Sequence, residues 1–524
     1  MSLPKFYWKR IAAVAMLPLL VACSAPERST MNPTAETPYP PNIIFILIDD
    51  LGSISTPYYQ DFKSGNSSWV YDENGDSADY KTPHLDRLAD HGTVFTRMYA
   101  TPYCAPSRGQ LMTGRYPFQT GIVYPGYTAC QPANLQSRLY GYLSDTISTY
   151  ANVLKDYGYQ TAFGGKWNLR FGRENACFDH STNYTNLVSV QKEHLNTHGF
   201  DSTYGPNALL GAMVDYYPPQ MGGRYFPDQL NQWAIQKINQ LDSSKPFYLH
   251  YCMGLIHEEL DSLCVDAPTP DGPHQSKAAI FASKMAYADS LIGEVIKTLE
   301  QKGILENTLL IVAGDNGTEN DYFSKYRGMI VRGGKGTTFD HGSRVPFIVH
   351  WPEQIKKKSL DTDLADFADV FPTMAQLCET YDSSLAPVSL SGIQGTSLLG
   401  RMTQGNLGGK DSIRKFVYCQ FNTTAFIANE KFQWIINYRD SIGDPRPSDT
   451  TFYQIYGPGV QRIPTNPNDH PEVADAFLAY YNQLNPDLTN GLAWSSRKRQ
   501  MFTLEDSIPK CYENGCTHFS RCEN

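Results

Sequence analysis

One cysteine in this sequence has neighbours that favour chemistry over packing. The stretch "YATPYCAPSRGQLMTGRYP" places Cys104 between two prolines and four residues before Arg108. Pro106 sets the backbone angle of a first helical position, so we expect Cys104 at the N-terminus of a helix. Free N–H groups and the helix dipole favour negative charge there, and Arg108 in the first turn can reach the same place. The alternative is a buried structural thiol, which would need neither the prolines nor the arginine.

Two pairs of oxygen-bearing side chains each follow an apolar run. Asp49 and Asp50 end "NIIFILIDD", and Asp315 and Asn316 end "LLIVAGDN". Neighbouring carboxylates repel one another unless a cation neutralises them, and an all-oxygen set suits calcium or magnesium and not zinc. Each pair could instead cap a helix. The presence of both pairs at predicted strand ends favours a metal site.

Three further residues carry positive charge or can gain it at similar positions. Lys166 follows a Gly-Gly pair, Lys335 lies in "RGGKG", and His257 follows another apolar run. Each has an alternative, namely a solvated lysine, a glycine loop that cradles an anion with its backbone, and a surface histidine. The formal net charge is −9, so nucleic-acid binding through a basic surface is not expected. A protein of this charge that acts on a polyanion must gather its cations inside a pocket.

Continuous apolar runs that alternate with helical stretches indicate the elements that position these residues. Runs without polar alternation predict strands buried on both faces of a parallel sheet. The pattern predicts an α/β fold, in which a large mixed, mostly parallel sheet is flanked by helices. Ligands bind beyond the carboxyl ends of such strands, where all the candidate residues fall. After about residue 385 the segments "FVYCQF", "TAFIANEKFQWIINY" and "TTFYQIYG" and a helix from about Pro471 to Leu484 predict a smaller α+β subdomain of antiparallel sheet.

The N-terminus has the pattern of an export signal. A basic start is followed by an apolar run, Ile11 to Ala22, that is too short to span a bilayer. The run ends in "LVAC", which resembles a bacterial lipobox. The resemblance implies cleavage before Cys23 and a lipid anchor on that residue, and thus a location in the cell envelope, at the outer membrane or in the periplasm. An ordinary signal peptide is the alternative. We therefore expect four parts: signal peptide 1–22, flexible tether 23–41, catalytic domain 42–385, and a C-terminal subdomain 386–524 with a Cys-rich tail.

The stretch around Cys104 resembles a family signature. "CAPSRGQLMTGR" is similar to the C-x-P-S-R-x-x-L-x-T-G-R motif of the formylglycine-dependent type I sulfatases, members of the alkaline phosphatase superfamily. The resemblance continues, in family order, through "PNIIFILIDDLG", "TPHLDRLADHGTVFTRMYA", "YGYQTAFGGKWNL", "KPFYLHYCMGLIH", "NTLLIVAGDNG", "RGGKGTTFDHGSRVPFIVHWP" and "DFADVFPTMAQL". It covers about Asn42 to Leu399 and is loose beyond.

The resemblance implies a function for each candidate. A separate maturation enzyme would oxidise Cys104 to formylglycine, whose hydrate attacks the sulfur of a sulfate ester. Calcium, with magnesium the less suitable ion, would be held by Asp49, Asp50, Asp315, Asn316 and the modified Cys104. Arg108 would steady the hydrate, Lys166 and Lys335 would bind sulfate oxygens, and His257 would lie near the bridging oxygen.

One position departs from the family pattern. The family usually reads G-K-W-H where this chain reads "GKWN", so that Asn168 replaces a histidine that helps to deprotonate the second hydroxyl of the hydrate. An amide cannot take a proton at neutral pH. His341, in "FDHG", stands where the family usually has a glycine, and we hypothesise that it compensates; a surface histidine is the alternative.

The resulting prediction is a sulfuric ester hydrolase. The 34 tyrosines and the expected envelope tether favour a sulfated oligo- or polysaccharide substrate. Two alternatives remain at this stage: a phosphonate monoester or phosphodiester hydrolase, and a non-catalytic lipoprotein that binds anionic glycans. The sequence gives no signal for an oligomeric state.

Overall fold

A large mixed sheet forms the centre of the computed structural model. The structure describes residues 40–123, 143–169, 184–204, 226–257, 276–407, 414–438, 447–456 and 461–484. The main sheet has the strand order β14 (Ser359–Asp361), β4 (Thr93–Phe95), β13 (Phe347–His350), β9 (Thr308–Gly314), β1 (Asn42–Ile48), β8 (Phe247–Met253), β6 (Gln160–Gly165) and β7 (Ser202–Tyr204). Only β13 runs antiparallel to its neighbours within this described sheet. The predicted mostly parallel α/β architecture is confirmed.

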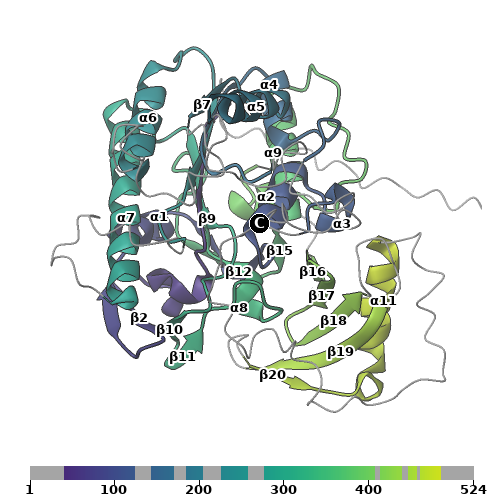
Figure 1. Ribbon diagram of the computed structural model, residues 1–524. Coiled ribbons are helices and arrows are strands. Elements are labelled where there is room, and N and C mark those ends of the chain that lie inside the picture. Colours follow the sequence, from purple (N-terminus) through teal and green to yellow (C-terminus); the bar gives the residue numbers. More distant parts are fainter. Residues whose placement is uncertain are drawn as a thin grey trace, which may run out of the picture.

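Strand β1 shows why the sheet is buried on both faces. Ile43, Phe45 and Leu47 belong to one apolar cluster, and the alternate residues Ile44, Ile46 and Ile48 belong to another. Successive side chains of a strand point to opposite faces, so a run without polar residues requires helices on both sides. One side carries α1 (Pro83–Asp90), α6 (Phe226–Gln240) and α7 (Lys277–Gln301), and the other α2 (Cys104–Thr113), α4 (Tyr150–Asp156), α5 (Tyr184–Thr197) and α9 (Val370–Tyr381) (Figure 1).

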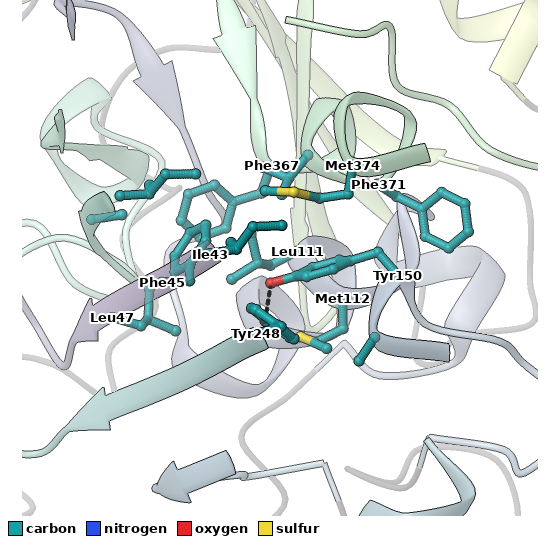
Figure 2. Close-up of a cluster of buried hydrophobic side chains, with 14 of the residues drawn as sticks. Ile43, Phe45, Leu47, Leu111, Met112, Tyr150, Tyr248, Phe367, Phe371 and Met374 are labelled. Atoms are coloured by element: carbon teal, nitrogen blue, oxygen red, sulfur yellow. Dashed lines mark hydrogen bonds between the residues drawn. The ribbon is translucent and has the colours of Figure 1, made fainter. Parts of the chain in front are cut away.

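The first of these clusters anchors the helix that begins at Cys104. Leu111 and Met112 of α2 pack among residues of β1 and α9 (Figure 2). Within the same cluster the hydroxyls of Tyr150 and Tyr248 lie 2.6 Å apart and form a hydrogen bond. A buried hydroxyl needs such a partner, so this bond satisfies two polar groups at once. The α2 helix is therefore fixed by packing against the sheet.

Two small sheets lie beside the main one and were not predicted. The first has the order β11 (Met329–Arg332), β10 (Tyr322–Tyr326), β2 (Ser68–Asp72) and β3 (Ser77–Tyr80), and the second β12 (Arg344–Val345), β5 (Met98–Tyr99) and β15 (Ala365–Asp366). The short helical segments are η1 (Ser53–Ser55), η2 (Pro57–Gln60), α3 (Pro117–Thr120), α8 (Asp340–Ser343), η6 (Phe367–Asp369), α10 (Leu399–Met402) and η7 (Pro467–Asp469).

The C-terminal part forms a separate antiparallel sheet with one helix, as the sequence predicts. Its elements are β16 (Val417–Phe421), β17 (Thr424–Ala428), β18 (Phe432–Tyr438), β19 (Pro447–Tyr456), β20 (Gln461–Pro464) and α11 (Pro471–Leu484) (Figure 1, lower right). Leu398, Leu399 and Met402 pack in the core of the main domain. The predicted signal peptide, most of the tether and the Cys-rich tail fall outside the described residues. Within the described residues no helix is long and apolar enough to cross a membrane.

Candidate active site

The carboxyl ends of the adjacent strands β1 and β9 bring the acidic residues together. Ile48 of β1 lies opposite Met253 of β8 and Gly314 of β9. Asp50 has a left-handed backbone, with a φ of 60°, and its N–H donates to Asp315 Oδ1 at 3.0 Å. The N–H of Asp315 donates to the carbonyl of Ile48 at 3.2 Å. The loops after β1 and β9 are thus tied to one another directly beneath the carboxylates.

Cys104 lies at the start of α2 and faces these carboxylates. Its Sγ is 3.3 Å from Asp49 Oδ1 and 3.8 Å from Asp50 Oδ1, and the residue is 4% exposed. Burial, followed by the charges of Asp315 and Asp49, raises the pKa of this thiol well above its usual value. In the site without a cation these effects outweigh the helix N-terminus, so Cys104 is there a neutral thiol and not a thiolate nucleophile at neutral pH.

The residues present suit a hard divalent cation. Ligand atoms of Asp49, Asp50, Cys104 and Asp315 lie within 4.8 Å of one another, and all four residues are buried. The amide of Asn316 donates to Asp50 Oδ1 at 2.8 Å, while its own buried Oδ1 has no hydrogen-bond partner. A buried orphan acceptor is rare and is explained by a cation. Burial and the charge of Asp49 raise the pKa of Asp315 to about 7, because three carboxylates repel one another here.

Arg108 and Lys166 partly neutralise this cluster. Arg108 donates to Asp315 Oδ2 from Nε at 2.9 Å and from Nη2 at 2.7 Å, and its Nη1 donates to the carbonyl of Lys166 at 2.5 Å. Lys166 Nζ lies 2.5 Å from Asp49 Oδ2. Although burial opposes ionisation of Asp49, the charges of Lys166, His257 and Arg108 hold the pKa of Asp49 well below its usual value. The predicted cations and carboxylates therefore form one buried cluster.

Lys335 reaches the cluster from the glycine loop and reveals a residue that sequence reasoning missed. Its Nζ lies 2.7 Å from Asp50 Oδ2 and 2.5 Å from Glu319 Oε1. Burial raises the pKa of Glu319, and Lys335 opposes that rise. Glu319 lies only four residues after Asp315, and that proximity is the signal that could have identified it.

His257 lies at the edge of the cluster and is half-buried. Its Nε2 is 3.9 Å from Asp50 Oδ2. Burial and the neighbouring Lys166 lower its pKa to about 4, so the imidazole is neutral at neutral pH in the free site. It can accept a proton, and donating one to a leaving group requires that its pKa rise when substrate binds.

Asn168 and His341 are both buried. In sequence, Asn168 lies close to Lys166 and His341 lies close to Lys335. Asn168 follows Lys166 by two residues and has a φ of 58°. The ring of His341 stacks on Phe339 with centroids 5.4 Å apart, and a Cβ placed on Gly334 would lie 2.5 Å from its Cδ2. His341 thus packs on the residue that precedes Lys335. Its compensation for Asn168 stays a prediction.

The backbone around Lys166 is held from two sides. Gly165 has a φ of 97°, and a Cβ there would lie 1.9 Å from the carbonyl oxygen of Cys252, so only glycine fits. Trp167 donates from Nε1 to His194 Nδ1 at 3.0 Å, and His194 Nε2 lies 2.8 Å from the carbonyl of Leu143. These contacts fix the turn that presents Lys166.

The same bonds argue against a second metal site. Asp145, His194 and His198 have possible ligand atoms close together. Because His194 Nδ1 accepts the proton of Trp167, the His194 proton must lie on Nε2, where it is donated to the Leu143 carbonyl. His194 therefore has no lone pair for a metal.

Known proteins match this chain over much of its length. Residues 41–380 match the family model described as Sulfatase. The chain is 27% identical to N-acetylgalactosamine-6-sulfatase of Homo sapiens, over 71% of this chain and 67% of that protein. It is 29% identical to arylsulfatase A of Homo sapiens, over 69% of this chain and 68% of that protein.

Solved structures share the fold. The PsFucS1 sulfatase from Pseudoalteromonas sp. superimposes with a TM-score of 0.58 at 22% identity, covering 86% of this chain and 91% of that one. BT4656, solved in complex with its substrate D-glucosamine-2-N,6-O-disulfate, superimposes with a TM-score of 0.57 at 18% identity, covering 86% and 98%.

Proposed function

Since this chain belongs to the sulfatase family and is a sulfuric ester hydrolase, we propose that it desulfates a sulfated oligo- or polysaccharide through a formylglycine made from Cys104. The observation that carries this proposal is the position of Cys104, whose Sγ lies 3.3 Å from Asp49 Oδ1 within the buried carboxylates. Lys166, Lys335 and Arg108 surround the same point. The neutral thiol of Cys104 among these carboxylates is a poor nucleophile, whereas the hydrate of a formylglycine at position 104 supplies a hydroxyl nucleophile.

The cations of the chain offset the negative charge of the reaction. A sulfate ester repels an incoming nucleophile, and preorganised positive groups stabilise the charge that shifts in the transition state. Lys166, Lys335 and Arg108 supply three such groups. Asp49, Asp50, Asp315 and Asn316 would hold a divalent cation, which we propose is calcium and which supplies further positive charge when bound. The hydrated aldehyde offers one hydroxyl to attack sulfur and a second whose deprotonation releases sulfate.

His257 is the proposed proton donor to the departing sugar alcohol. Its pKa is low in the free site because of burial and Lys166. A bound sulfate group brings negative charge against Lys166, and this offsets the repulsion that keeps the imidazole neutral. We therefore expect His257 to be protonated when substrate is bound, and proton donation of this kind contributes roughly 10²–10⁴-fold to a rate.

Relatives and composition support a saccharide substrate. One matching relative is named for a sulfated N-acetylgalactosamine, and the structure of BT4656 holds a disulfated glucosamine. Tyrosine and other aromatic residues make up 13% of the chain, and their faces suit sugar rings. We also propose export with a lipid anchor at Cys23 and modification by a formylglycine-generating enzyme of the host, on the strength of the "LVAC" and "CAPSRGQLMTGR" sequences.

A free-sulfate assay tests the proposed activity. The protein is produced with a formylglycine-generating enzyme and incubated with a panel of sulfated glycans and with matched sulfate, phosphate and phosphonate esters. We expect sulfate release from at least one glycan, a slower reaction with phosphate or phosphonate, and no release by Cys104→Ala. Faster cleavage of the phosphorus esters would favour the phosphodiesterase alternative. Glycan binding without turnover by protein that carries formylglycine would favour a binding protein.

A further inference from the structure

The outward face of the small sheet β11–β10–β2–β3 carries aromatic and basic side chains. Strand β10 alternates, with Tyr322, Ser324 and Tyr326 buried and Phe323 and Lys325 facing outward. Large apolar residues are normally covered, yet Trp69 on β2 is 39% exposed and Ile330 on β11 is 56% exposed. Exposed apolar patches that are rimmed by polar residues mark binding surfaces.

The strand register arranges these residues in two rows. Phe323 lies opposite Tyr71 on β2 and opposite Arg332 on β11, which makes the first row. Lys325 lies opposite Ile330, and the continued register places Trp69 on its other side, which makes the second row. The Arg332 guanidinium lies over the Phe323 ring, 5.9 Å from its centroid. Each row thus combines an aromatic ring with one cation.

The first row begins next to the active site. Arg332 donates from Nε to the carbonyl of Asn320 at 2.7 Å, and Asn320 donates from Nδ2 to the carbonyl of Lys335 at 2.7 Å. The hairpin that carries the two rows therefore has Glu319 and Lys335 at its base. In Figure 1 the strands β2, β10 and β11 lie together at the lower left. Of the residues in the two rows, Arg332 would be the first that a substrate chain contacts if it extended from Lys335 along this hairpin.

We propose that this face binds the part of a sulfated saccharide chain that extends beyond the unit being desulfated. Sugar rings would lie on Trp69, Tyr71 and Phe323, and sulfate groups would pair with Lys325 and Arg332. This proposal rests on the proposed function, because it names where the rest of that substrate lies. The acidic Asp79 faces Trp69 from the neighbouring strand β3, so the sulfate groups would lie on the β10–β11 side of the aromatic rings, near Lys325 and Arg332.

A second copy of this chain is the competing occupant, because β11 is an edge strand with an exposed isoleucine. Two identical faces brought together would bury Lys325 and Arg332 against a surface that carries the same positive charges. Like charges in such an interface are unfavourable, whereas a polyanion complements both. Charge complementarity therefore favours the glycan.

Substrate length separates this face from the catalytic centre in a kinetic test. We expect the Trp69→Ala/Lys325→Ala variant to raise the KM for a sulfated oligosaccharide roughly tenfold, because a stacking surface and a charge are lost. Its kcat/KM for the small ester p-nitrocatechol sulfate should stay at the wild-type value. Leu360→Ala, which changes an exposed apolar residue of β14, is the matched control and should change neither. Equal KM values for wild type and double variant on the oligosaccharide would overturn the proposal.

A binding assay makes the proposal independent of turnover. The Cys104→Ala protein is run through gels that contain heparin, chondroitin sulfate or carrageenan. We expect at least one polysaccharide to retard it, the retardation to weaken with salt, and Trp69→Ala/Lys325→Ala to remove most of it. No retardation by any of the three, or retardation unchanged in the double variant, would overturn the inference even if the enzyme is active. The face would instead be assigned to self-association if the protein sediments as a dimer and Ile330→Lys dissociates that dimer, while Trp69→Ala/Lys325→Ala leaves the retardation by polysaccharide unchanged.

Discussion

At the scale of single residues, Lys335 combines a buried position with two ion pairs. Its ammonium group lies between Asp50 and Glu319 and is almost fully buried. Removing one partner of a buried ion pair leaves an uncompensated charge, so such a substitution affects folding as well as catalysis. Activity alone therefore cannot report the function of this lysine.

A paired substitution separates the two effects. We expect Lys335→Met to lower the free energy of unfolding by about 3–5 kcal/mol, because the buried Asp50 and the half-buried Glu319 lose the cation that pairs with both. Glu319→Gln/Lys335→Met should recover most of that loss in calcium buffer, where Asp50 would pair with the proposed ion. Both variants should lose roughly 10²–10³-fold in kcat/KM for a sulfate ester, since a cation at the reacting group is missing. Recovery of activity together with stability would contradict the assignment of Lys335 to sulfate binding.

His341 is the second residue whose contribution can be measured directly. If it takes the proton that Asn168 cannot take, His341→Ala slows sulfate release but not the first step, in which the alcohol departs. Single-turnover measurements that follow alcohol and sulfate separately distinguish these steps, with His341→Gln as a control of similar shape. Unchanged sulfate release in His341→Ala would show that the compensation hypothesis is wrong.

The residue types and spacing predicted most of the cluster but not all of it. Asp49, Asp50, Asp315 and Asn316 could be assigned because each pair follows an apolar strand, and the structure brings all four together. Glu319 could not be assigned, because a glutamate in a loop is ordinary until its contact with Lys335 is known. That contact forms because the β10–β11 hairpin turns the chain back, so that Lys335, which follows the hairpin, lies next to Glu319, which precedes it.

At the scale of elements, the buried strands were predictable and the half-exposed ones were not. Runs such as "NIIFILI" have one interpretation, because a strand without polar residues must be covered on both faces. Strands β2 and β10 alternate in burial over five positions, but their sequences SWVYD and YFSKY do not alternate apolar and polar residues, so the sequence carries no strand signal there. The antiparallel direction of β13 is set by the long connection from residue 315 to 346, and the apolar pattern carries no sign of direction.

One contact at this scale ties the C-terminal sheet to the main domain. Arg414, just before β16, forms ion pairs with Asp366 and Asp369, and its Nη1 donates to the Tyr116 hydroxyl at 2.9 Å. Both aspartates are fully buried. Burial raises the pKa of Asp366 to about 7, and the charge of Arg414 opposes that rise. The arginine therefore neutralises two buried carboxyl groups that lie close to each other.

We expect Arg414→Ala to lower the free energy of unfolding by about 3–5 kcal/mol in urea, because two buried carboxylates lose their partner. Arg87→Ala, which removes an arginine from an exposed pair with Glu300, is the matched control and should cost at most about 1 kcal/mol. Similar losses for the two variants would contradict the proposed anchoring of the C-terminal sheet by Arg414.

At the scale of the whole molecule, the fold places four strand ends around one point and covers them with helices and the glycine loop. Carboxylates from separate strands repel one another there, so a bound cation stabilises the folded state. We expect chelation with EGTA to lower the melting temperature and abolish activity, and added calcium to restore both. At a calcium concentration of 100 times its dissociation constant the gain is about 2.7 kcal/mol.

Asn316→Ala tests the same site by substitution. It removes the buried Oδ1 that has no hydrogen-bond partner, so it should reduce the calcium-dependent shift in melting temperature. If magnesium but not calcium fully restored the melting temperature and activity after EGTA treatment, the proposed assignment of the ion as calcium would be wrong. An unchanged melting temperature in EGTA would contradict a cation site at this cluster.

The most direct test of the central claim is mass spectrometry of the peptide that contains Cys104, made on active protein from cells with a formylglycine-generating enzyme. The claim predicts an aldehyde at position 104 that reacts with a hydrazide probe, in a fraction that matches the specific activity of each preparation. Fully active protein with an unmodified thiol at that position would contradict it.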